Sequence, residues 1–151
     1  MRVLTQAGAL FERALRLDPA NAQAWADRAY ALALQARAQQ ASAGAAAQIG
    51  LEAGRAAIAA LSRSAIVPEF WLRLGVALDL QGRAEPAGRA FARALQLAPM
   101  NALAWYHLAY HLSLTPATRG LAQGALDICL RLDPGNRNAE NLRQQLANQS
   151  H

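Results

Sequence analysis

The sequence contains no lysine and only one cysteine, and β-branched residues are few. A single cysteine excludes a disulfide within the chain and any zinc site built from several cysteines. All 15 basic residues are arginine and 38 residues are alanine, a composition that indicates a GC-rich genome, and we expect a bacterial source. Abundant alanine with few β-branched residues favours α-helix throughout.

The sequence also lacks the patterns that mark common catalytic sites. Its paired glycines, Gly50 and Gly54, lie in a helical pattern and form no phosphate-binding loop. No serine has a nearby histidine with a third partner. Cys129 takes the place of a small packing residue, and no neighbour in the sequence would lower its pKa. We therefore predict a protein that is not an enzyme and needs no cofactor.

No stretch has the composition of a membrane span or a signal peptide. Residues 38–51 are uncharged but rich in Gln, Ser and Gly. Near the N-terminus, Glu12 and Arg13 interrupt the only apolar run. We predict a single soluble domain, 1–151, without a membrane span. Its compartment is left open; as part of a membrane protein it would lie on the cytoplasmic or the periplasmic face.

Residues 68–101 carry the most informative pattern. They predict two short amphipathic helices joined by a turn at 81–83. The first helix has the spacing W-x2-L-G-x2-L, and the second has A-x3-F followed by a proline; the residues are Trp71, Leu74, Gly75, Leu78, Ala87, Phe91 and Pro99. This 34-residue stretch resembles a tetratricopeptide repeat.

The same spacing recurs along the chain. Trp105 follows Trp71 by 34 residues, whereas Trp71 follows Trp25 by 46, which is one repeat plus a 12-residue insertion. We predict an all-α, right-handed superhelix. Its units are a half repeat at 2–18, a repeat at 22–67 with the insertion at 35–50, repeats at 68–101 and 102–136, and a capping helix at 137–149. The insertion should lengthen both helices of its repeat, with a turn near 42–44.

The half repeat at 2–18 has no first helix to cover it. Each repeat of such an array buries its apolar face against its neighbours. We therefore expect the chain to be an excerpt of a longer protein, with this helix either bare or covered by a second copy in a homodimer.

The resemblance implies that the first helices line a concave groove that binds another protein. The family's contact positions fall on Gln23, Ala26, Tyr30, Ala33, Glu69, Leu72, Val76, Asp79, Leu103, Tyr106, Tyr110 and Ser113. None is the Lys, Arg or Asn with which chaperone-binding members hold a carboxylate. Our main candidates are Tyr30, Glu69, Leu72, Val76, Asp79, Tyr106 and Tyr110, which favour an apolar or weakly basic peptide or helix. In the alternative interpretation the tyrosines only pack against adjacent helices.

Two other groups of residues have a structural and a functional interpretation. His107 and His111 share a helical face and could hold a metal, but no third ligand follows, so structural histidines are favoured over a metal-binding protein. Arginines on successive second helices form an outward stripe without interleaved aromatics, which favours a solvated face and no nucleic acid.

Arg28 replaces the leucine of other repeats and should reach a carboxylate or bend outward.

The run from Val67 through the segment 105–112 also resembles the tetratricopeptide tails that follow bacterial membrane proteins of the O-antigen ligase type. That resemblance implies an alternative function, a soluble appendage of a membrane glycan ligase or polymerase. A protein-interaction scaffold remains the first prediction.

Overall fold

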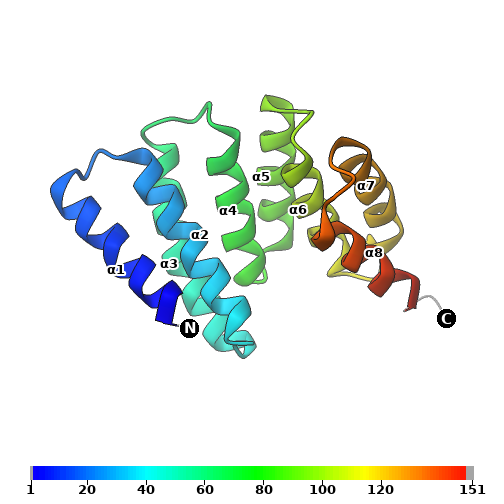
Figure 1. Cartoon of the computed structure of the whole chain (residues 1–151), viewed down its shortest axis with the longest axis horizontal. Helices are drawn as coiled ribbons and strands as arrows, with labels where there is room; N and C mark the ends of the chain where they lie inside the picture. Colours follow the sequence, from blue (N-terminus) through cyan, green and yellow to red (C-terminus); the bar gives the residue numbers. More distant parts are fainter. Residues whose placement is uncertain (1, 149–151) are drawn as a thin grey trace.

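The computed structural model describes residues 2–148, and the side chains from residue 6 onward. Within this range the chain is entirely helical: α1 (Arg2–Leu17), α2 (Ala22–Ala38), α3 (Ala43–Leu61), α4 (Pro68–Leu80), α5 (Ala84–Leu97), α6 (Ala102–Ser113), α7 (Arg119–Leu132) and α8 (Arg137–Asn148). The predicted all-α fold is confirmed. Figure 1 shows the helices in a row, with α1 at one end and α7 and α8 at the other.

Short polar caps and turns set the helix ends. Asn21, Ser42 and Asn101 each accept a hydrogen bond from a backbone N–H of the following helix, which satisfies a donor that has no partner within the helix. The turn between α4 and α5 contains Gly82 at φ 70°, a left-handed conformation that glycine adopts without steric cost.

The helices contact one another in a pattern that defines an inner and an outer side. Each helix packs against its neighbours in sequence, and the first helices α2, α4, α6 and α8 also contact one another in succession. In the described part of the chain, α1, α3, α5 and α7 contact only first helices. The first helices therefore form the concave wall of the superhelix. The arginines of the predicted stripe on the second helices, Arg13, Arg16, Arg55, Arg89, Arg93 and Arg131, are all exposed.

The recurring tryptophan ties each repeat to the turn before it. The indole Nε1–H of Trp25, Trp71 and Trp105 donates to a backbone carbonyl six residues earlier, at 3.0, 2.8 and 2.8 Å. A buried indole usually requires such a partner. The repeat period in the sequence thus reflects a repeated hydrogen bond that orients successive repeats.

The insertion is helical. It lengthens α2 and α3 to 17 and 19 residues and leaves a turn at 39–42, as its alanine and glutamine content favours. The third repeat, at 102–136, is one residue longer than the 34-residue second repeat, and its two helices are joined by a turn at 114–118.

Helix α1 packs against α2 alone among the described helices. Arg28 of α2 reaches Glu12 of α1 at 3.5 Å, one of the two outcomes that the sequence predicted. Leu10 and Leu17 remain exposed on α1. A homodimer through this helix stays a prediction.

Across the described residues, no helix combines the length and the apolar character needed to cross a bilayer.

Candidate binding groove

Two arginine–tyrosine pairs lie on the concave wall. The guanidinium of Arg73, on α4, lies 3.8 Å from the ring centre of Tyr30 on α2. The guanidinium of Arg37, at the end of α2, lies 4.6 Å from the ring centre of Tyr110 on α6. Such contacts attract the cation to the aromatic face. The second pair links α2 to α6, two repeats apart in the array.

Arg73 is largely enclosed. Its Nε and Nη1 atoms are buried and have no hydrogen-bond partner among the described residues. Burial lowers the pKa of Arg73, while Tyr30, Asp27 and Glu69 act in the opposite direction. Tyr30 is thus held in a packed pair, with acids nearby that compensate the charge of Arg73.

Two pockets meet at Arg37 and Tyr110. The larger, about 280 Å³, is lined by Arg37, Tyr106, Tyr110, Asn138, Asn141, Leu142 and Gln145. The smaller, about 110 Å³, is lined by Arg37, Val76, Asp79, Leu80, Tyr110 and Leu114. One pocket is rich in amides and hydroxyls and the other is mainly apolar, so the two offer adjacent sites of different chemistry.

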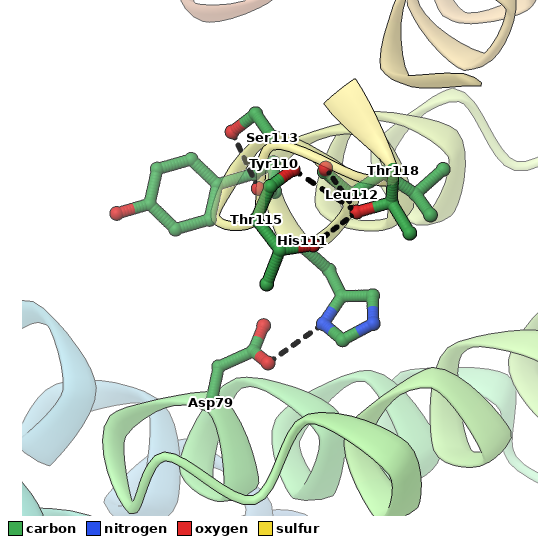
Figure 2. A network of polar contacts seen from close by, with 7 residues as sticks. All are labelled: Asp79, Tyr110, His111, Leu112, Ser113, Thr115 and Thr118. Atoms are coloured by element: carbon green, nitrogen blue, oxygen red, sulfur yellow. Dashed lines mark hydrogen bonds and ion pairs between the residues drawn. The ribbon is translucent and has the colours of Figure 1, made fainter. Parts of the chain in front are cut away.

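Asp79 is joined to α6 by a histidine. Its Oδ1 lies 2.7 Å from Nδ1 of His111, and the two side chains are only 10% and 13% exposed. Figure 2 shows the carboxylate of α4 pointing at the imidazole of α6. Burial raises the pKa of Asp79, and the bond to His111 partly offsets this. Asp79 is therefore not a free acid on the groove surface.

The end of α6 beside this pair is fixed by hydroxyl groups, as Figure 2 also shows. Ser113 donates to the carbonyl of Tyr110 at 2.6 Å, and Thr118 donates to the carbonyl of Leu112 at 2.7 Å. These bonds satisfy carbonyls at the helix C-terminus. They hold the backbone that carries Tyr110 and His111.

His107 is a core residue. It is 3% exposed, and its ring is stacked parallel to that of Phe91. Burial, with Arg37 and Arg73, lowers its pKa to about 3. Neither ring nitrogen has a hydrogen-bond partner in the described part of the chain. Nor do three His, Cys, Asp or Glu side chains within residues 2–148 come together as metal ligands would.

The structure brings together only part of the predicted contact set. Val76, Asp79, Tyr106 and Tyr110 line the two pockets. Leu72 has no exposed surface and packs in the core. Glu69 lies beside Asn101, whose amide donates to it at 3.5 Å. Leu72, Glu69 and Tyr30 line neither of the two pockets.

Four polar pocket residues were missed by the sequence analysis, as were the apolar Leu80, Leu114 and Leu142. Asn138, Asn141 and Gln145 lie on one face of α8, at the spacing i, i+3, i+7. The sequence analysis interprets α8 only as a capping helix, although the i, i+3, i+7 spacing of these amides indicates a shared polar face. Arg37 was missed because it lies in the insertion, where alignment of the repeats gives no equivalent position.

Comparison with known proteins agrees with this architecture. Residues 10–42 match the sequence profile of the family described as Tetratricopeptide repeat. No curated protein matches the chain.

Several solved structures share the fold. The structure titled MamA 41-end from Desulfovibrio magneticus RS-1 has 17% identity and a TM-score of 0.65, over 89% of this chain and 68% of that one. Another, titled Crystal structure of MamA, has the same identity and TM-score over 96% and 83%. A chain of a CopN–Scc3 complex has 13% identity and a TM-score of 0.58 over 91% and 74%. The helix arrangement and these likenesses show an all-α tetratricopeptide-type solenoid, and the sequence of residues 10–42 itself matches the repeat family.

Proposed function

We propose that the chain is a protein-interaction scaffold that binds a peptide or helical segment of a partner on its concave wall. The observation that carries this proposal is the pair of adjoining pockets at Arg37 and Tyr110. Aromatic residues and arginine are the residue types enriched at protein interfaces. Here they come from different repeats and converge on one place.

The chemistry of the two pockets suits a peptide. Val76, Leu80 and Leu114 surround the smaller pocket and favour an apolar side chain. In the larger pocket, amide groups can both donate and accept hydrogen bonds, as a peptide backbone requires. The tyrosines offer large contact surfaces that lose little rotational freedom when they bind.

The proposal includes no catalytic step. Burial raises the pKa of the Cys129 thiol, the chain's single cysteine. A buried thiol with a raised pKa is a poor nucleophile. An appendage of a membrane glycan ligase could use the same groove, and that more specific role stays a prediction from sequence resemblance.

The proposal is tested by selecting peptides from a displayed library of random sequences. Binding of the strongest selected peptide is then measured by calorimetry for the wild type and for Tyr106→Ala/Tyr110→Ala. We expect the double variant to bind about tenfold more weakly or worse, because truncated aromatic contacts at interfaces typically cost more than about 1 kcal/mol.

The matched control is Arg55→Ala/Arg89→Ala, which changes two exposed residues on the outer helices. It should bind within about twofold of the wild type, because surface changes away from a site have small effects. Full binding by the tyrosine variant, or loss of binding by the control, would reject the groove as the site. Thermal melting of each variant confirms that it is folded.

A further inference from the structure

We propose that Arg37 makes the groove selective for peptides in which an acidic residue stands beside an apolar one. This inference rests on the proposed function and specifies the partner: an acidic peptide segment. It also assigns a role to the insertion, which carries Arg37.

Arg37 presents a positive charge that the chain itself does not pair. Its side chain makes no hydrogen bond or ion pair with another described residue, and its one specific contact is the face of Tyr110. Asp79 lines the smaller pocket with Arg37, whose charge acts to lower the pKa of Asp79, but the direct contact of the Asp79 carboxylate, at 2.7 Å, is with His111. A guanidinium has five N–H donors in a planar fork that matches a carboxylate. Contact with the face of Tyr110 leaves these in-plane donors available to a ligand.

The larger pocket supplies further donors for the same carboxylate. The amides of Asn138, Asn141 and Gln145 line it together with the two tyrosines. Burial raises the pKa of Tyr106 above its usual value, so its phenol remains protonated at neutral pH and can donate. No acidic side chain lines this pocket.

The adjoining pocket places an apolar residue next to the acid. It shares Arg37 and Tyr110 with the larger pocket and is otherwise lined by Val76, Leu80, Leu114 and Asp79, whose carboxylate contacts His111. A peptide that crosses from one pocket to the other would therefore present an acidic and an apolar side chain close together in its sequence.

The sequence analysis favours an apolar or weakly basic partner because its predicted contact residues contain the acid Asp79 and do not contain Arg37. The structure places Asp79 in a nearly buried contact and Arg37 between the pockets. The surroundings of Arg73 differ, since Asp27 and Glu69 offset its charge. Among the described residues, Arg37 has only Asp79 as an acidic neighbour of this kind, and that carboxylate directly contacts His111.

Arg37 reaches this place because the insertion lengthens its helix. Helix α2 has 17 residues, against 13 for α4 and 12 for α6. Its last turn, at 1.5 Å per residue, extends beyond the length of the other first helices and carries the arginine to Tyr110. We infer that the insertion changes the specificity of an otherwise regular array.

The test repeats the peptide selection with four proteins: wild type, Arg37→Gln, Arg37→Glu, and Arg55→Gln as an exposed control. Peptides selected by the wild type should be enriched in Asp or Glu within one or two positions of an aliphatic or aromatic residue. Arg37→Gln should lose the acidic enrichment and keep the apolar one. Arg37→Glu should favour Lys or Arg, and Arg55→Gln should resemble the wild type.

One selected peptide then provides a second measurement that does not depend on the folding of a variant. Replacing its acidic residue by Gln or Asn should weaken binding to the wild type about tenfold, because the peptide loses the charge that strengthens its hydrogen bonds to the guanidinium. The same replacement should have little effect on Arg37→Gln, because that variant has already lost the partner charge.

The outcomes separate this inference from the function on which it rests. If the wild type selects peptides without acidic residues, or if Arg37→Gln keeps the acidic enrichment, the role of Arg37 is wrong while the groove remains. If the wild type selects no peptide at all, the groove function fails and this inference fails with it.

Discussion

The first and second repeats build similar helix pairs from different side chains. In α2 and α3 all buried residues are alanine or glycine. In α4 and α5 they include Phe70, Leu72, Val76, Leu78 and Phe91. The first repeat therefore combines long helices with many small contacts, whereas the second uses short helices and a few large side chains.

The difference shows two ways to stabilise one geometry. In the second repeat Phe91 is almost fully buried and packs directly on Gly75, where an added Cβ would lie 2.5 Å from the ring. In the first repeat the fully buried residues of α2 and α3 are small, and the partly buried Trp25 and Leu32 pack against their alanines. Stabilisation should be concentrated at single residues in one repeat and distributed over many in the other.

The largest expected effect comes from Phe91→Ala. Removing a fully buried phenylalanine should lower the free energy of unfolding by about 3–5 kcal/mol, because it leaves a cavity as well as losing burial. Phe11, which occupies the same repeat position in the half-covered α1, is only partly buried. Phe11→Ala should therefore cost clearly less in urea denaturation. Equal losses would contradict the view that the second repeat concentrates the stability.

Gly50→Ala tests the close approach of α3 to α4, where the first repeat meets the second. A Cβ there would lie 2.9 Å from both the carbonyl oxygen of Ala77 and Cβ of Leu80 on α4, and neither atom can move away cheaply. We expect a loss of about 1–3 kcal/mol. The matched control is Gly124→Ala in α7, where nothing lies within 4 Å of the added carbon. It should gain up to about 1 kcal/mol from helix propensity, and a gain at both sites would refute close packing at Gly50.

His107 extends the comparison to the third repeat, where it takes the position held by Arg73 in the second. Its folded-state pKa of about 3 lies below the ordinary value of 6.5. Below pH 6.5 the unfolded chain binds a proton that the folded chain does not, so its contribution to stability is complete above that pH and falls toward pH 3. Relative to His107→Leu, the wild type should lose about 2 kcal/mol between pH 7 and pH 5.

Denaturation at several pH values measures this difference. Other titrating groups, including the Asp79–His111 pair, are present in both proteins, so their contributions cancel in the comparison. Parallel pH profiles for the two proteins would show that His107 is charged or solvated in the folded state.

The smallest effect is expected from Arg28→Leu, which makes the first repeat more like the others. Arg28 bonds to Glu12, whose side chain is 55% exposed, and ion pairs with an exposed partner contribute about 0–1 kcal/mol. We expect a change within about 1 kcal/mol in either direction, measured by urea denaturation against Glu12→Gln. A larger loss would mean that the ion pair, and not packing, holds α1 on α2.

The repeat pattern was sufficient to predict the helices and their order, because each repeat position has one local environment. The tryptophans and the phenylalanine–glycine contact follow from such positions, whereas the helical form of the insertion follows from its alanine and glutamine content. Contacts across the superhelix depend on its curvature, which a repeat alignment does not contain. The sequence therefore did not predict the contact of Arg37 with Tyr110 or that of Asp79 with His111. It also predicted Leu72 as a groove residue, whereas Leu72 lies in the core.

The central claim is that the concave wall, and not the arginine-rich outer face, binds the partner. Hydrogen–deuterium exchange with and without a selected peptide tests it directly, because bound segments exchange more slowly. We predict slower exchange at the end of α2 and along α4, α6 and α8, with α3, α5 and α7 unchanged. Slower exchange confined to α3, α5 and α7 would contradict the account.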